Sequence, residues 1–321
     1  MTELLLSEEQ RYTLFPIKYP KIWDMYKKQL ACFWVASEID FSKDLNDWNN
    51  KLSEDERYFI KHILAFFAGS DGIVGINILD NFSKEVKILE AQMTYNFQGT
   101  MESIHSEVYS LMIETYINNH NEKNILFNAI TEIPCIKKKA DWALSWIEKS
   151  DKESFAKRLV AFAIMEGLFF SGAFCAIYWI KERGILPGLT KSNEFIARDE
   201  RLHTEFACLL YSYIENKLDK EIIYNMIDEA VKIETEFIVD SLPIRMIGMN
   251  SDLITQYIKY VADWLLNNLG YPKKYNINNP FSFMNFIGME SRSNFFEERT
   301  STYQKASVFN TDTKLEETDD F

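Results

Sequence analysis

Apolar residues recur every three or four positions along almost the whole chain, and no stretch shows the strict alternation of a β-strand. Ser53 and Glu56 have the spacing of a capping box, and Pro187-Gly188 interrupts the chain before another helix. Long helices joined by short loops are typical of antiparallel bundles, so an all-α fold is predicted. The pattern predicts long helices at 20–38, 53–81, 84–118, 122–149, 153–183, 190–214, 219–246 and 251–269, with a shorter one near 281–294.

The chain is long for one domain, yet no linker divides its 321 residues. Only 11 glycines and 7 prolines occur, and 47% of the residues are hydrophobic, which is ample for one large core. We therefore expect a single helical domain over 1–299. The remaining segment, 300–321, is acidic, polar and without periodicity, which favours a flexible tail in the free protein.

Charge and cysteine content narrow the class of protein. The formal net charge of −13 argues against a nucleic-acid surface. The nearest basic run, Lys137-Lys138-Lys139, is predicted to be a solvated helix face. The four cysteines form no CxxC pair and are typical of a reduced compartment. The first residues lack the basic flank and apolar segment of a signal peptide, so a cytoplasmic protein is expected.

The segment 159–180 is apolar except for Glu166, and by length it qualifies as a membrane span. We expect no second segment of this kind in the chain, and an ionised carboxylate in mid-bilayer is costly. The pattern thus favours a buried central helix, with a membrane protein as the more distant reading. In either case a buried carboxylate must be paired, protonated or bound to a metal.

Two predicted helices carry the same motif, Glu-x-x-His. Glu102 and His105 lie about 60° apart around one helix axis, and Glu200 and His203 repeat the spacing on another. The flanking positions are apolar, so these polar groups face a dry interior and need partners there. The motif alone is suggestive rather than specific, because acids are frequent in this chain.

Two isolated acids make the pattern specific. Asp71 and Glu166 each stand alone in an apolar stretch of a further helix. Di-iron and di-manganese carboxylate bundles use one carboxylate from each of two helices and Glu-x-x-His from the other two. Four carboxylates offset the charge of two divalent ions, and oxygen with imidazole ligands suits iron or manganese. The alternative is a set of unrelated buried acids satisfied by arginine or backbone donors.

Tyr109 lies one helical turn beyond His105. A buried tyrosine is most often a packing residue, but a redox tyrosine beside metals needs an apolar wall around it. Phe170 and Phe174, one and two turns past Glu166, and Ile196, one turn before Glu200, are predicted to form such a wall.

The stretches MESIHSEVYSLMIETY, AFFAGSDGIV and SNEFIARDERLH resemble the small, radical-generating subunit of class I ribonucleotide reductase, of the eukaryotic and viral type. The resemblance runs from FPIKYPKIWDMYKK to the terminal TDDF. It implies a ferritin-like di-iron carboxylate bundle with extra flanking helices and two iron ions per chain, although manganese accepts the same ligands. The implied metal ligands are Asp71, Glu102, His105, Glu166, Glu200 and His203.

The same resemblance gives roles to residues that spacing does not single out. Tyr109 matches the radical-bearing tyrosine, and Trp34 matches the tryptophan that passes an electron to the metal site. Asp199 matches the acid that links this tryptophan to the metal-bound His105. Tyr303 matches the tyrosine that relays the radical between subunits. The terminal peptide resembles the segment that docks on the large subunit, with Leu315, Asp319, Asp320 and Phe321 as its candidate contacts.

The implied function is that of a ribonucleoside-diphosphate reductase small subunit. Its di-iron centre would activate O₂, form a tyrosyl radical, and pass it to a large subunit that reduces ribonucleoside diphosphates. A homodimer is expected from the family. Alternatives are a di-iron oxidase or ferroxidase on the same scaffold, and a non-catalytic partner subunit. The chain departs from the family pattern at GIVGIN (72–77), at Leu315 and at Arg201, which is expected to face outward.

Overall fold

A computed structural model describes residues 4–7, 11–148 and 154–284 of the chain. These residues form helices and no strand, which confirms the all-α prediction. The elements are η1 (Leu4–Leu6), α1 (Pro20–Ala31), η2 (Ala36–Glu38), η3 (Phe41–Asp44), α2 (Leu45–Asn50), α3 (Glu54–Asn77), η4 (Ile78–Phe82), α4 (Ser83–Glu85), α5 (Leu89–Tyr116), α6 (His120–Phe127), α7 (Ala129–Glu132), α8 (Pro134–Glu148), α9 (Phe155–Ile164), η5 (Met165–Phe169), α10 (Ser171–Lys181), α11 (Pro187–Ser212), α12 (Lys220–Thr235), η6 (Glu236–Ser241), η7 (Ile244–Ile247) and α13 (Ser251–Asn268).

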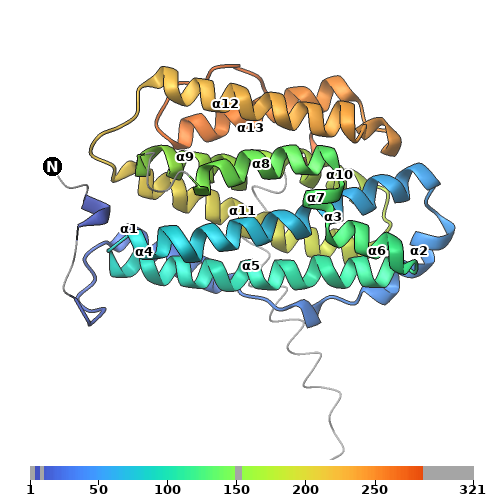
Figure 1. Cartoon of the computed structure of the whole chain (residues 1–321), viewed down its shortest axis with the longest axis horizontal. Coiled ribbons are helices and arrows are strands. Elements are labelled where there is room, and N and C mark those ends of the chain that lie inside the picture. Colours follow the sequence, from blue (N-terminus) through green and yellow to red (C-terminus); the bar gives the residue numbers. More distant parts are fainter. Residues whose placement is uncertain (1–3, 8–10, 149–153, 285–321) are drawn as a thin grey trace, which may run out of the picture.

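The bundle is built in layers along one long axis (Figure 1). Helices α3 and α5 pack against each other on one side, and α9 and α10 pack on α11 in the middle. Helices α12 and α13 lie together on the opposite side (Figure 1). Each long helix buries an apolar face against its neighbours, so one continuous hydrophobic core fills the space between the layers.

Several predicted helices have different ends in the structure. The helix expected at 20–38 ends at Ala31, so Trp34 lies in the irregular segment that follows it. The helix expected at 122–149 is three helices, because the chain turns at Asn128 and again before Pro134, which has no N–H for a continuing helix. Residues 41–50 form the short helices η3 and α2, which the pattern did not predict.

Three long helices contain or continue into a single π-helical turn: η4 after α3, η5 between α9 and α10, and η6 after α12. A π turn inserts one extra residue into a helix and shifts the face on which later residues lie. The hydrophobic pattern predicts continuous helices at 53–81, 153–183 and 219–246 and does not reveal these turns.

The capping box at the start of α3 is confirmed. The Ser53 hydroxyl accepts from the backbone N–H of Glu56 at 3.2 Å, and the Ser53 N–H donates to the Glu56 carboxylate at 2.7 Å. Most of the helix predicted at 281–294 lies outside the described residues, as does the predicted tail 300–321.

Two helical stretches, Glu54–Glu85 and Phe155–Lys181, are long and apolar enough to cross a membrane by length and composition. The expectation of a single such segment was therefore wrong. The most apolar window of the second stretch is 94% buried within the bundle, which fits the predicted central core helix.

Helix α11 begins at Pro187, three residues earlier than predicted, and its N-terminus is capped by a distant part of the chain. Asp44 is fully buried and accepts hydrogen bonds from the backbone N–H groups of Gly188 and Leu189, at 2.7 and 2.8 Å. It also accepts from the hydroxyl of Tyr116 on α5, at 2.5 Å. One carboxylate thus joins the start of α11 to α5.

We expect Asp44→Ala to lower the free energy of unfolding by about 3 kcal/mol, because three buried donors would each lose a hydrogen bond worth about 1 kcal/mol. Chemical denaturation of the metal-free protein measures the change. The matched control is Asp141→Ala, whose exposed carboxylate pairs with Lys137 one turn away and should leave the curve unchanged. Equal curves for both variants would contradict this account of the cap.

Candidate metal centre

Four helical segments bring the six predicted ligands to one place in the core. They all lie in the interior, with exposures between 0 and 3%. Two groups of ligating atoms form, and in each group the atoms lie within 4.8 Å of one another. The first group is Asp71, Glu102 and His105; the second is Glu102, Glu166, Glu200 and His203. Glu102 belongs to both, so two adjacent ions would share it.

Glu102 and Glu200 each turn one oxygen toward each histidine. The Nδ1 atom of His105 lies 3.6 Å from Glu102 Oε2 and 3.0 Å from Glu200 Oε1. The Nδ1 atom of His203 lies 2.9 Å from Glu102 Oε1 and 3.2 Å from Glu200 Oε2. A carboxylate with its two oxygens directed at two different ligands is placed to bridge a pair of ions.

Several of these buried polar atoms form no hydrogen bond of suitable geometry, although some of them lie close to another ligand atom. They are Asp71 Oδ2, both Glu102 oxygens, His105 Nδ1, Glu166 Oε2 and Glu200 Oε1. Such atoms are costly in a folded protein unless something else satisfies them. Two divalent cations would do so, since the unpaired atoms are carboxylate oxygens and an imidazole nitrogen, which iron and manganese accept. The residues therefore fit a two-metal centre.

The pKa values of the cluster residues also favour bound cations. Burial, together with the neighbouring Glu102 and Glu200 charges, raises the pKa of Asp71 well above its usual value. Burial likewise raises the pKa of Glu166. Burial alone would lower the pKa of His203, but the Glu102 and Glu200 carboxylates outweigh it and raise that pKa to about 9. Without cations the cluster must hold extra protons to limit repulsion between its carboxylates.

Glu166 sits inside η5 rather than in a regular α-helix. Its Oε1 atom accepts a hydrogen bond at 3.3 Å from the side-chain amide of Gln98, which is fully buried on α5. Sequence reasoning missed Gln98. A signal was present, because Gln98 is a polar residue about one turn before Glu102 on the same apolar stripe.

Asp199 connects Trp34 to the cluster. The indole N–H of Trp34 donates to Asp199 Oδ2 at 2.7 Å, and the same oxygen lies 3.2 Å from His105 Nε2. The other oxygen accepts from Arg198 at 3.0 and 3.1 Å. Burial opposes a charge on Asp199, yet Arg198 and His105 hold its pKa below the usual value. Arg198 was not predicted, because nothing in its spacing separates it from a surface arginine.

Tyr109 is buried one turn beyond His105, and its hydroxyl has no hydrogen-bond partner. The ring in stacking contact with it belongs to Phe67, at 4.7 Å between centroids and 11° between planes. The ring centroids of Phe170 and Phe174 lie 5.7 and 5.0 Å from that of Phe67. Sequence reasoning missed Phe67, although it lies one turn before Asp71.

The predicted wall residues are all in the interior. Phe170 is 2% exposed, Phe174 8% and Ile196 1%. Burial, followed by the charge of Asp71, raises the pKa of Tyr109 well above its usual value, so the phenol stays protonated near neutral pH.

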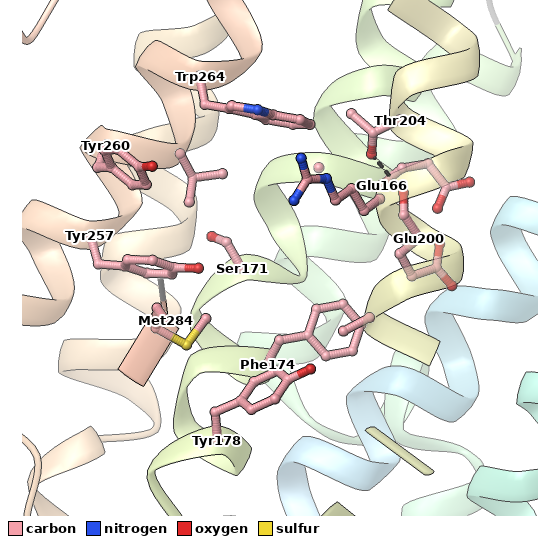
Figure 2. A pocket seen from close by; sticks show the side chains of 14 residues that line it. Glu166, Ser171, Phe174, Tyr178, Glu200, Thr204, Tyr257, Tyr260, Trp264 and Met284 are labelled. Carbon is pink, nitrogen blue, oxygen red and sulfur yellow. Dashed lines mark hydrogen bonds between the residues drawn. The ribbon is translucent and has the colours of Figure 1, made fainter. Parts of the chain in front are cut away.

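A cavity of about 330 Å³ borders the second ligand group (Figure 2). Glu166 and Glu200 line one side of it, and Tyr257, Tyr260 and Trp264 line the other (Figure 2). The cavity gives the cluster open space beside Glu166 and Glu200.

Two of the departures from the family pattern, Arg201 and the GIVGIN stretch, lie near this centre. Arg201 is exposed, as expected, but it also lines the cavity, and it donates to Glu205 at 3.0 Å. A Cβ at Gly75, in the GIVGIN stretch, would lie 3.8 Å from the Cβ of Glu102, so a larger residue there would contact the shared ligand. The predicted sites in the tail lie outside the described residues: Tyr303, Leu315, Asp319, Asp320 and Phe321.

Fold and site together define a ferritin-like helical protein with a buried carboxylate–histidine cluster able to hold metal. Comparisons with known proteins specify it further. The family model described as "Ribonucleotide reductase, small chain" matches residues 11–280.

Individual relatives agree with the family match. The ribonucleoside-diphosphate reductase small chain of Neurospora crassa is 58% identical over 98% of this chain and 76% of its own length. The Variola virus small chain is 53% identical over 96% of both chains. The solved Rnr4 homodimer of Saccharomyces cerevisiae has a TM-score of 0.82 and 39% identity, covering 94% of this chain and 93% of that one.

The chain belongs to the ribonucleotide reductase small chain family. It is the small subunit of ribonucleoside-diphosphate reductase, an oxidoreductase, and membership implies a large-subunit partner.

The two ligand groups predict different losses of metal. Because Glu102 belongs to both groups, Glu102→Ala should reduce the bound Fe(II) or Mn(II) from about two ions per chain to nearly none. Asp71→Ala should remove about one ion, since only the first group contains Asp71. Elemental analysis after loading and desalting measures both. Equal metal content in the two variants would contradict a shared Glu102.

Proposed function

We propose that this small subunit binds two iron ions in the described centre and stores a radical on Tyr109. The observation that carries the proposal is the pair of ligand groups sharing Glu102, with unpaired donor atoms one turn away from a buried tyrosine. When bound, the metals supply the oxidation of the tyrosine by dioxygen. Manganese accepts the same ligands and is the alternative metal.

Tyr109 has the surroundings that a stored radical requires. Its raised pKa keeps the phenol protonated, so oxidation removes an electron and a proton together and leaves a neutral radical. Phe67 covers one face of the ring, and Phe170 and Phe174 pack on Phe67 and extend the aromatic wall. Ile196 completes the apolar lining in this proposal. Such a pocket keeps water and reductants from the radical.

Trp34 and Asp199 form the proposed route for electrons. The Trp34 N–H, the Asp199 carboxylate and His105 Nε2 are in sequence within hydrogen-bonding distance. Asp199 accepts from Nε2, so Nδ1 of His105 is left free to bind metal. We propose that an electron enters through Trp34 during radical formation and that the radical later leaves by the same route, with Tyr303 as the next relay.

The tail is the proposed contact with the large subunit. An acidic, flexible peptide that ends in an aromatic residue suits a groove on a partner. Its proposed docking contacts are Leu315, Asp319, Asp320 and Phe321. In the large subunit the radical would initiate reduction of a ribonucleoside diphosphate to its deoxy form.

We also propose a homodimer, as in the solved yeast relative, and a cytoplasmic location.

The finer function is tested by electron paramagnetic resonance after Fe(II) and O₂ are added to the metal-free protein. The parent should show a tyrosyl signal, and Tyr109→Phe should show none while binding the same amount of iron. Tyr95→Phe is the matched control, because Tyr95 is also buried on α5 with an unpartnered hydroxyl. It should retain the signal.

Other outcomes of the electron paramagnetic resonance experiment would favour other functions. Iron binding without a radical in the parent would favour a di-iron oxidase or ferroxidase, or a manganese requirement, which loading with Mn(II) would then decide. Absence of metal binding would leave the non-catalytic partner subunit. A signal that persists in Tyr109→Phe would place the radical on a different residue.

Trp34→Phe tests the electron route. Phenylalanine keeps an aromatic ring but removes the N–H that Asp199 accepts, so deoxynucleotide formation with a large subunit should fall to background at unchanged metal content. Trp48→Phe is the control, because Trp48 is buried but stacks on Tyr116 instead. Full activity of Trp34→Phe would rule out this route.

A further inference from the structure

Lys139 is buried, which corrects the prediction that the run Lys137-Lys138-Lys139 is a solvated face. Lys137 and Lys138 are exposed and pair with Asp141 and Glu236. Lys139 is only 2% exposed, because one further residue along α8 turns its side chain into the core.

The ammonium group of Lys139 lies among groups from four elements. It is 2.6 Å from Glu234 Oε2 on α12, and it donates to the backbone carbonyl of Phe169 in η5 at 2.5 Å. The ring centroids of Phe66 and Phe237 lie 3.7 and 4.1 Å away. Glu234 is fully buried as well.

An ion pair in such a place is expensive. Burial lowers the pKa of Lys139 to about 8 and raises that of Glu234. Well-packed apolar residues often stabilise a core as much as a buried pair does. The contacts of this pair with the backbone therefore need a reason beyond stability.

Lys139 and Glu234 bind the two sides of the junction between the π turn η5 and helix α10. Phe169 is the last residue of η5, and Gly172 is the second residue of α10. Lys139 donates a hydrogen bond to the Phe169 carbonyl, while Glu234 Oε1 accepts one from the N–H of Gly172 at 3.1 Å. Helix ends expose backbone groups that regular hydrogen bonding leaves unpaired.

The close approach of Glu234 depends on the absence of a side chain at residue 172. A Cβ there would lie 2.7 Å from Glu234 Oε1, so the glycine makes room for the carboxylate.

We propose that the buried residues Lys139 and Glu234 position Glu166 through their hydrogen bonds to the backbone junction at the end of the π turn on which Glu166 sits. The inference rests on the proposed metal centre, in which Glu166 is a ligand of the second group. A π turn has weaker regular hydrogen bonding than an α-helix, and ligand positions must be held to a fraction of an ångström. Lys139 and Glu234 are thus positioning residues that act through the backbone.

The test compares Glu234→Leu with Glu234→Gln in metal-free protein titrated with Mn(II), with free Mn(II) followed by electron paramagnetic resonance. Glutamine keeps an oxygen that can accept from Gly172, and leucine does not. We expect Glu234→Leu to weaken one of the two Mn(II) sites about tenfold. Glu234→Gln should bind like the parent. In an Asp71→Ala background only the second group remains, so the loss can be measured there alone.

Arg158→Met separates positioning from stability. Arg158 is a buried cation on α9, eight residues before Glu166, and it donates to Glu85 at 2.7 Å. This variant should lower the melting temperature and leave both Mn(II) affinities unchanged.

Lys139→Met should weaken the second site, because Phe169 loses its donor. If a single variant does not fold, Lys139→Met/Glu234→Leu leaves an apolar pair that tolerates burial and should show the same weakened site.

Two results would overturn the inference, and they differ from failure of the proposed centre. If the parent binds two Mn(II) ions and Glu234→Leu binds them equally well, the pair is only structural and the centre stands. If Glu234→Leu and Glu234→Gln lose affinity equally, the hydrogen bond to Gly172 is not the cause. A parent that binds no Mn(II) would instead contradict the metal centre itself, and the inference with it.

Discussion

The burial of four carboxylates around two histidines is the constraint on which this structure depends. In the dry core, Asp71 and Glu166 resist ionisation, while the histidines hold protons that offset the remaining charge. Two divalent cations would replace those protons. The frame must therefore hold these ligands close together before the cations bind.

The surrounding helices meet this demand with contacts made far from the ligands in sequence. Asp44 fixes the start of α11, on which Glu200 and His203 lie. Lys139 and Glu234 hydrogen-bond to the backbone at the junction that follows Glu166. Both devices bury charge or polarity in order to define backbone position, and both join elements that are distant along the chain.

The surroundings of the metal centre differ from one direction to the next. Toward Tyr109 it is closed by stacked aromatic rings and offers the hydroxyl no partner. Toward Trp34 it continues into a chain of hydrogen-bonding groups through Asp199. A cavity opens beside Glu166 and Glu200 (Figure 2). A dry side suits storage of a radical, and a hydrogen-bonded side suits its transfer.

The sequence by itself determined the helical class and the candidate ligands. Within a helix each residue advances by a fixed angle, so Glu-x-x-His places both groups on one face, and a lone acid in an apolar run must be buried. Only tertiary structure decided that Phe67 covers Tyr109, that Lys139 is buried, and that a π turn carries Glu166. Those features depend on how helices far apart in the chain pack together, and no local spacing encodes that contact.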